Sequence, residues 1–433
     1  MGEVADLQLG RQRSPKNHSG PHMRPYLRAA NVTWDGIDLT DVKEMNFEPA
    51  EATTFQLAAG DLLLNEASGS PNEVGKPAIW KGEFDGCCFQ NTLLRVRSRG
   101  PSMDYLYWYC RLAALSGDFG RAGRGVNIRH LGKAGLASFP LPMAPAAEQH
   151  RIVAAVEEHL SRLDAADAAV RSAERRIGAL ERSIITKAAS TLDVPRHWRL
   201  ATVDQAGTVA LGLQRSPKRH SGPNMRPYLR VANVFEDRID DGDVMSMDMT
   251  DAEWDRFRLR DGDVLLNEGQ SPELLGRPAI YHGAPPDVAF TNSLIRFQAS
   301  DGVDPEWALL VFRSHMHNRR FMRESQITTN IAHLAAGRFK TVEFPIPPLP
   351  EQRARVAASR RGLDSCNRLR SEIHTARRRA TALRGSILSA AFSGKLVRQD
   401  PDDEPASVLL ERIRSDRAAT PPARRNRTRA TFR

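Results

Sequence analysis

The stretch QRSPKNHSGPHMRPYLRAAN, from Gln12 to Asn31, recurs as QRSPKRHSGPNMRPYLRVAN from Gln214 to Asn233. Seventeen of these twenty positions are identical, and the offset is 202 residues. The similarity ends with FPLPMAPAAEQ at 139–149 and FPIPPLPEQ at 344–352. A period this long is not that of a solenoid repeat. The chain therefore contains a duplicated domain, and whatever one half does, the other half should do as well.

Length and composition agree with a duplicated globular protein. A chain of 433 residues with 41% hydrophobic residues is long enough for two or three domains. No apolar run is long enough to span a membrane, and the start MGEVADLQLGRQ has no apolar core typical of a secretion signal. The four cysteines have no metal-ligand spacing, so we expect free thiols in the cytoplasm and no metal site.

The net charge of +10 favours a polyanionic partner, because Lys and Arg release condensed counterions when they bind one. The basic segment 417–433, RAATPPARRNRTRATFR, has almost no large apolar residue. We expect it to be a disordered basic tail.

Each half begins with short extended segments and ends with a long helix. YLRAANV, DLLLNE and TLLRVR in the first copy, with their counterparts in the second, lie between turn residues and predict strands. MDYLYWYCRLAAL and PEWALLVFRSHMHNRRFM predict a helix in each copy. The expected fold class is α+β, with two duplicated mixed α/β domains at 1–146 and 192–349. Two long antiparallel coiled-coil helices should join them with pseudo-two-fold symmetry.

The long helices are expected at 147–191 and 350–397, followed by a C-terminal segment and tail at 398–433. Apolar residues there recur in steps of three and four, and the two copies share the same steps. The predicted apolar seam consists of Leu160, Leu163, Val170, Ile177, Leu180, Ile184, Leu363, Leu369, Ile373, Leu383 and Ile387. A narrow seam does not hold a single helix in water, so the two helices should pair with each other. The alternative is that each helix packs on its own domain.

Signatures of catalysis are absent from the sequence. GSPNEVGKP at 69–77 resembles a phosphate-binding loop, but it has one residue too many between the glycines and Pro77 in place of the required Ser or Thr. No dinucleotide-binding, amino-methylation, zinc-protease or serine-hydrolase motif occurs. We therefore expect no catalytic residue and a protein that binds rather than reacts.

The residues expected to contact DNA lie in the repeated turn and in a loop at 119–128, which is matched at 321–331. Short hydroxyl side chains and Lys bind phosphates, Arg pairs with guanine, and Asn, Gln and Thr read base edges. The candidates are Arg13, Ser14, Lys16, His18, Arg24, Arg121, Arg124 and Asn127 in the first copy, with Arg215, Ser216, Lys218, His220, Arg226, Arg323, Gln326, Thr328 and Asn330 in the second.

The repeated order of YLR-x-ANV, GD-x-LL, G-[KR]-PAI, FP-[LI]-P-…-EQ and a long helix resembles the specificity subunit of type I restriction-modification systems. RGSILSAAFSGKLVRQDPDDEPASVLLERI, at 384–413, is similar to that family's C-terminal conserved region. The resemblance implies that the globular domains are target recognition domains and that the helices are conserved spacers. The first copy lacks a counterpart of VPRHWRLATVDQAG at 194–207, so we expect its N-terminus to be shortened or its first strand to be supplied differently.

The resemblance also implies partners. The family's specificity subunit binds double-stranded DNA and two modification subunits, which carry S-adenosylmethionine, and restriction subunits that use ATP and Mg²⁺ join the full complex. No cofactor is expected in this chain. Three alternatives stay open from the sequence: a specificity subunit of a methyltransferase-only system, a single-chain DNA-modifying enzyme, and a coiled-coil adaptor for proteins only. Because the turns are nearly identical, the two DNA half-sites are expected to form an imperfect inverted repeat.

Overall fold

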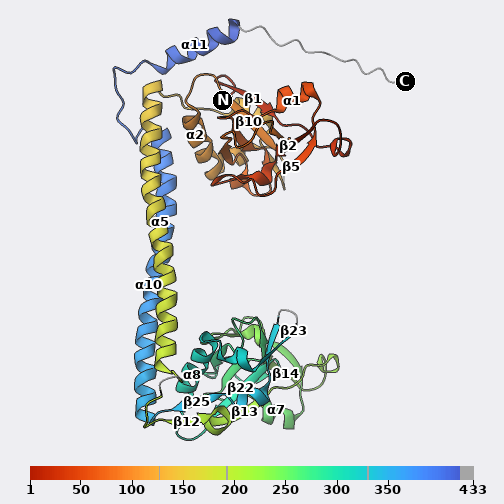
Figure 1. The fold of residues 1–433 in the computed structure, drawn as a ribbon, viewed down its shortest axis with the longest axis vertical. Coiled ribbons are helices and arrows are strands. Elements are labelled where there is room, and N and C mark those ends of the chain that lie inside the picture. The colour runs from red at the N-terminus through yellow and green to blue at the C-terminus, as the bar shows by residue number, and fades with distance from the viewer. Residues whose placement is uncertain (126, 192–193, 329–330, 420–433) are drawn as a thin grey trace, which may run out of the picture. The chain divides into compact units, whose positions relative to one another are not determined.

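The computed structural model describes residues 1–125, 127–191, 194–328 and 331–419. It divides into two compact units, the first comprising Met1–Ala169 and Ala376–Arg433 and the second Val170–Thr375. Each unit contains one mixed α/β domain and part of each of two long helices, α5 (Ala146–Ala188) and α10 (Leu349–Phe392) (Figure 1). The predicted fold class is confirmed.

An antiparallel four-stranded sheet forms the centre of each domain. In the first domain its strands are, in spatial order, β1 (Ala5–Leu9), β10 (Leu93–Ser98), β6 (Leu62–Asn65) and β8 (Pro77–Ile79). In the second they are β13 (Gly207–Leu211), β22 (Leu294–Ala299), β18 (Val264–Asn267) and β20 (Pro278–Ile280). The equal order shows that the sequence duplication is also a duplication of the fold.

Both faces of this sheet are buried, which explains why LLLN is apolar without alternation. Leu62 and Leu64 pack with helix α2 (Met103–Leu115) in one core, while Leu63 packs with Phe89 in another. Successive strand residues point to opposite faces, so a strand covered on both sides needs consecutive apolar residues. In the second domain, α8 (Pro305–His317) takes the place of α2.

A smaller mixed sheet and a short helix cover the second face. In the first domain they are β5 (Lys43–Asn46), β2 (Met23–Leu27), β9 (Cys88–Phe89) and α1 (Pro49–Phe55). In the second they are β17 (Met245–Asp248), β14 (Met225–Leu229), β21 (Ala289–Phe290) and α7 (Asp251–Phe257). The repeated MRPYL segment is therefore the central strand of this sheet in each copy.

Short elements complete the two domains. Those of the first are η1 (Pro15–Asn17), η2 (Ala29–Asn31), β3 (Val32–Thr33), β4 (Gly36–Ile37), β7 (Ala67–Ser68), η3 (Pro71–Glu73), α3 (Asp118–Ala122), β11 (Arg129–His130) and α4 (Gly132–Ser138). Those of the second are β12 (Arg199–Thr202), α6 (Val203–Ala206), η4 (Pro217–Arg219), η5 (Val231–Asn233), β15 (Val234–Phe235), β16 (Arg238–Ile239), β19 (Gly269–Gln270), η6 (Arg320–Glu324), β23 (Ser325–Thr328), β24 (Ile331–Leu334), α9 (Ala336–Lys340) and β25 (Glu343–Ile346).

The repeated asparagine of YLR-x-AN has a structural role. Asn31 is buried, and its side-chain nitrogen donates to the carbonyl oxygens of Asp38 (2.9 Å) and Asp41 (3.1 Å). Its side-chain oxygen accepts a hydrogen bond from the amide of Arg28 at 3.0 Å. Asn233 repeats these bonds in the second domain. Part of the repeated sequence therefore closes a loop and does not face a ligand.

The glutamine of the repeated EQ motif attaches each long helix to its domain. Gln149 is buried, and its Oε1 accepts from the amide of Ser102 at 2.9 Å, just before α2. Its Nε2 donates to the carbonyl oxygen of Ala144, also at 2.9 Å. Gln352, at the start of α10, makes the corresponding bonds in the second domain with one more donation. The motif thus fixes the start of each long helix to its own domain.

The predicted apolar seam is partly wrong. Leu160, Ile177 and Ile387 are buried, and Leu163, Val170, Ile184, Leu363 and Ile373 are half-buried. In contrast, Leu180, Leu369 and Leu383 are 50%, 44% and 49% exposed. The covered face of α5 continues from Leu163 to Asp167 and Val170, in the alternating steps of four and three of a left-handed coiled coil. At some positions of the seam the covered residue is therefore charged. The apolar pattern had placed a neighbouring apolar residue there.

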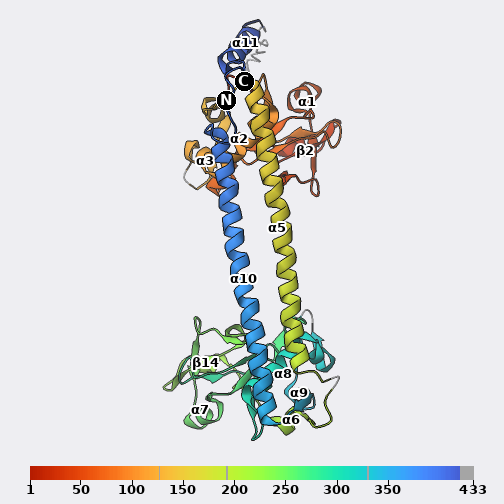
Figure 2. The ribbon, with the colours of Figure 1, turned by 90° about the vertical axis from the view of Figure 1, so that its left-hand side faces the viewer.

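Ion pairs join the two long helices within each unit. In the first unit, Arg384 of α10 contacts Asp167 at 2.8 Å and Asp164 at 2.6 Å on α5. In the second, Arg370 of α10 contacts Glu181 of α5 at 2.5 Å. Also within the second unit, Nη1 of Arg355 donates to the carbonyl oxygen of Ala188 at 3.4 Å. From Arg355 to Arg370 the residue numbers rise along α10, while those of their partners fall along α5, so the two helices pair antiparallel; Figure 2 shows both helices.

The first domain has a different outer edge from the second. In the second domain, β12 pairs with β25. Residues 138–141 correspond to β25, and no described strand pairs with them. Instead, Leu409 and Ile413 of helix α11 (Ala406–Ala419) pack with Val4 and the half-buried Leu141. At this edge the described residues thus place a helix and not a strand, so the expectation that the first strand is supplied differently is not confirmed. Because α11 extends to residue 419, residues 417–419 are not part of a disordered tail; residues 420–433 lie outside the described residues.

Candidate nucleic-acid interface

The repeated turn and the predicted loop meet at one end of the central sheet. Because β10 runs antiparallel to both β1 and β6, the end of β1, the start of β10 and the end of β6 lie at the same end of the sheet. The turn with η1 follows β1, and β7 follows β6 and pairs with β11, which ends the loop. Two segments about 100 residues apart in the sequence are thus brought to one edge of the first domain.

The second domain repeats this arrangement with a longer hairpin. The turn with η4 follows β13, and β19 follows β18 at the same edge. Strand β19 pairs with β24, which pairs with β23. Loops at the end of a rigid sheet are a common place for residues that bind a ligand.

The predicted turn residues are accessible in both copies. Arg13, Lys16 and His18 are exposed and Ser14 is half-exposed. The Nε of Arg13 donates to Nε2 of His18 at 3.2 Å. The second copy has the same exposure at Arg215, Ser216, Lys218 and His220, and a hollow of about 810 Å³ borders this turn. Arg24 and Arg226 follow on β2 and β14 and are half-buried.

The predicted loop residues are only partly accessible to a ligand. Arg121 belongs to α3, where it pairs with Asp118 and donates to the carbonyl oxygen of Ser116 at 2.9 Å. It is therefore engaged in its own helix, which corrects its assignment to the loop. Arg124, Asn127 and Arg323 are exposed. Gln326 and Thr328 belong to β23 by their backbone, and Asn330 lies outside the described residues.

A repeated Glu–His pair holds this loop to the sheet, and the sequence analysis missed it. Oε2 of Glu66 lies 2.9 Å from Nδ1 of His130, and the carbonyl oxygen of Glu66 accepts from the amide of Leu131 at 2.8 Å. Glu268 and His333 repeat the side-chain contact at 3.2 Å. The signal was present, because the glutamate of LLNE and the histidine that follows N-I recur at nearly the same offset.

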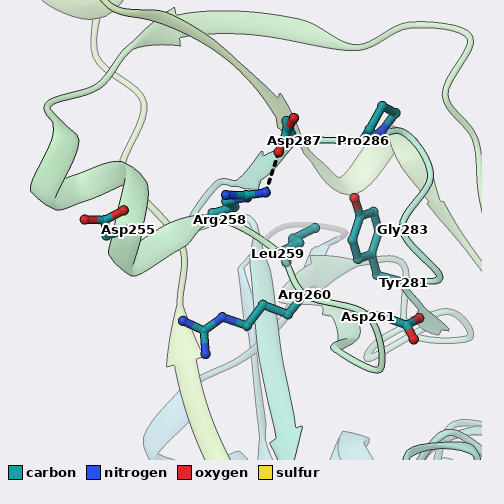
Figure 3. A pocket seen from close by; sticks show the side chains of 9 residues that line it. All are labelled: Asp255, Arg258, Leu259, Arg260, Asp261, Tyr281, Gly283, Pro286 and Asp287. Carbon is teal, nitrogen blue, oxygen red and sulfur yellow. Dashed lines mark ion pairs between the residues drawn. The ribbon is translucent and has the colours of Figure 1, made fainter.

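A second hollow of the second domain lies at the opposite end of its sheet. A cavity of about 560 Å³ is lined by residues before β18 and after β20. Figure 3 shows Arg258 and Asp287 facing each other across part of it, 2.5 Å apart. The cavity also contains Asp255 and Asp261, so its carboxylates outnumber its two arginines. This composition does not suit a polyanion.

Within the described ranges, no group of three or more His, Cys, Asp or Glu side chains is placed to hold a metal ion. A search of the same ranges for a helix with the length and apolar character of a membrane span finds none.

The chain thus carries two equivalent domains, each with a turn and a loop at one end of its sheet and each attached to a long helix. The chain is 22% identical over 418 residues to the type I restriction enzyme EcoKI specificity subunit of Escherichia coli K12, covering 92% of this chain and 89% of that one. It is equally identical to the StySPI specificity subunit of Salmonella potsdam, with the same coverage. No protein-family model matches the chain.

Solved structures give the same result for the fold. A chain from a study of complex assembly and conformational transition of the type I restriction-modification system superimposes with a TM-score of 0.70 at 18% identity, covering 91% of this chain and 96% of that one. The HsdS subunit of Thermoanaerobacter tengcongensis gives 0.55 at 20% identity, covering 91% and 95%. In sequence and in fold, this chain is a relative of type I restriction enzyme specificity subunits, which confirms the resemblance inferred from the motifs.

Proposed function

We propose that this chain is the DNA-reading specificity subunit of a type I restriction-modification enzyme and that it performs no chemical step itself. The observation that carries the proposal is the same in both domains: at one end of the central sheet, a basic turn lies beside a loop that is held by a Glu–His pair. Base edges are read by side chains on such loops, while Lys and Ser bind phosphates.

Two readers on one chain imply a target with two separated half-sites and a fixed gap. Co-expression of the chain with its modification subunit, followed by sequencing of methylated adenines in the host, tests this directly. We expect one bipartite motif that disappears when the chain is deleted. Methylation without the chain, or a contiguous motif, would contradict the proposal. Binding of the complex to the motif should also weaken steeply with salt.

The long helices serve as the spacer in this proposal. Removing one heptad from α5 alone shifts its seam against α10 by about 10 Å, since a helix rises 1.5 Å per residue. We expect methylation to be lost or the gap to change. An unchanged motif with unchanged activity would exclude the spacer role.

Modification subunits, one for each repeat, are expected to dock on exposed arginines of the helices. Arg378 and Arg379 on α10 and Arg175 and Arg176 on α5 are exposed. Arg384 of α10 is instead engaged with Asp164 and Asp167 of α5. Charge reversal at Arg378 and Arg379 should weaken co-purification of the modification subunit and leave the methylated motif unchanged. Undiminished co-purification would move the docking site to the recognition domains. Restriction subunits and a cytoplasmic location belong to the same proposal.

A further inference from the structure

The two nearly identical turns are supported by different neighbours. Their own residues agree at seventeen of twenty positions, which suggests identical contacts with DNA. However, the short helix beside the turn differs: α1 reads PAEATTF and α7 reads DAEWDRF. Pro49 and Ala52 of the first copy thus correspond to Asp251 and Trp254 of the second.

In the second domain these differences engage the arginine of the MRPYL strand. Arg226 forms an ion pair with Asp251, and its guanidinium lies 4.8 Å from the ring centroid of Trp254. A carboxylate and an aromatic face are the two kinds of partner that a guanidinium prefers in proteins. Arg226 therefore has both of its preferred partners within its own domain.

The turn of the second domain is also fixed to α7. Arg219 replaces Asn17 of the first copy, and its two terminal nitrogens contact the two carboxylate oxygens of Glu253 at 2.7 and 2.9 Å. It also donates to the carbonyl oxygen of Asp248 at 3.2 Å. The Arg219 guanidinium lowers the pKa of Glu253 to about 2, so this carboxylate keeps its charge at any ordinary pH.

In the first domain the same groups are arranged differently. Glu51, which corresponds to Glu253, pairs with the buried Arg11 at 2.8 Å, and Arg11 comes from the end of β1 and not from the turn. Within the described residues, Arg24 has no carboxylate partner and no aromatic ring beneath it. Its guanidinium lies beside Gly86 and is thus not held by a counter-charge or a ring of its own domain.

We infer that Arg24 contacts DNA, whereas Arg226 is withheld from it by Asp251 and Trp254, so that the two turns do not read DNA alike. To reach a phosphate or a base, Arg226 would first have to give up both partners, and the exposed carboxylate of Asp251 would repel the phosphates. The inference rests on the proposed function. It replaces the expectation of similar half-sites at the shared turn: one half-site should depend on an arginine contact that the other lacks.

The test compares Arg24→Ala with its matched control Arg226→Ala in the complex with the modification subunit. We expect Arg24→Ala to weaken binding of a duplex that carries the methylated motif by about 5- to 150-fold, as for a lost specific contact. Arg226→Ala should leave binding unchanged. Equal losses, or no loss for Arg24→Ala, would overturn the inference. Thermal unfolding of each variant checks that the domain still folds.

A double variant frees Arg226 from its two partners. In the background Asp251→Ala with Trp254→Ala, the further change Arg226→Ala should lower DNA binding. If it still has no effect, Arg226 is not withheld by these residues and the inference fails. A parental complex that shows no salt-dependent binding to its own motif would instead refute the proposed function, so the two failures are distinguishable.

Discussion

Replacing Gln352, at the start of α10, by methionine is expected to destabilise the second domain. The side chain is fully buried and makes three hydrogen bonds: it accepts from the amide of Asp304 at 2.8 Å and donates to the carbonyl oxygens of Gly302 at 2.9 Å and Pro347 at 2.8 Å. Methionine keeps the volume, so the variant isolates the loss of hydrogen bonding.

The magnitude follows from the number of bonds. At about 0.5–1.5 kcal/mol for each bond, the loss is about 1.5–4.5 kcal/mol, towards the upper end because three backbone groups are left buried without a partner. The matched variant Gln149→Met in the first domain loses two bonds, hence about 1–3 kcal/mol. Each domain contains a buried tryptophan, Trp80 in the first and Trp307 in the second, so fluorescence reports the unfolding of both domains in denaturant.

The expected result is a lower denaturation midpoint for Gln352→Met, with a smaller shift for Gln149→Met. A loss below about 0.5 kcal/mol for Gln352→Met would refute the reasoning, because it is less than one ordinary hydrogen bond contributes. A loss of methylation at unchanged stability would also contradict it, since the glutamine would then act on DNA and not on the attachment of the helix.

Two further outcomes are expected. Reversing one charge of the Glu181–Arg370 pair should lower the free energy of unfolding by about 1 kcal/mol or less, because Arg370 is half exposed. Reversing both charges should recover part of this loss in a double-mutant cycle. A coupling energy of zero would mean that the pair contributes nothing to stability. Burial lowers the pKa of His315 to about 4, below its ordinary 6.5, so the stabilisation by the neutral ring is present above pH 6.5 and is lost as the pH falls towards 4. The loss of stability approaches about 3 kcal/mol. It should affect the second domain alone, because Ala113 occupies the equivalent position in the first. Equal acid sensitivity of both domains, or an unaltered dependence of stability on pH in His315→Asn, would contradict this.

Local sequence patterns predicted the elements well where burial alone determines them. MDYLYWYCRLAAL coincides with α2, from Met103 to Leu115. PEWALLVFRSHMHNRRFM was less accurate, because α8 ends at His317 and Arg319 adopts a left-handed backbone conformation with φ 54°. The apolar pattern does not change where α8 ends, because the chain beyond it is still buried at Phe321.

Features that depend on distant partners were predicted less well. The apolar pattern placed Leu180, Leu369 and Leu383 in the seam. It contains no information on the other helix, whose counter-charge allows a charged residue to be covered instead. The Glu66–His130 pair joins residues 64 positions apart, and only the duplication could have revealed it. Arg121 was assigned to a loop because neither its place in α3 nor its ion pair with Asp118 can be recognised in the sequence.

The charges between the long helices show that the two halves are no longer interchangeable. Along α5, Asp167, Glu174 and Glu181 recur every seven residues, whereas the residues at the same interval along α10 are Arg370, Arg377 and Arg384. If the second half were exchanged for another copy of the first, acids would meet acids along the pairing face, and like charges oppose pairing. The two helices thus carry opposite charges at equivalent positions. A chain whose second half is replaced by another copy of the first should therefore fail to pair its helices, whereas a chain in which only the second recognition domain is replaced and α10 is kept should still pair them.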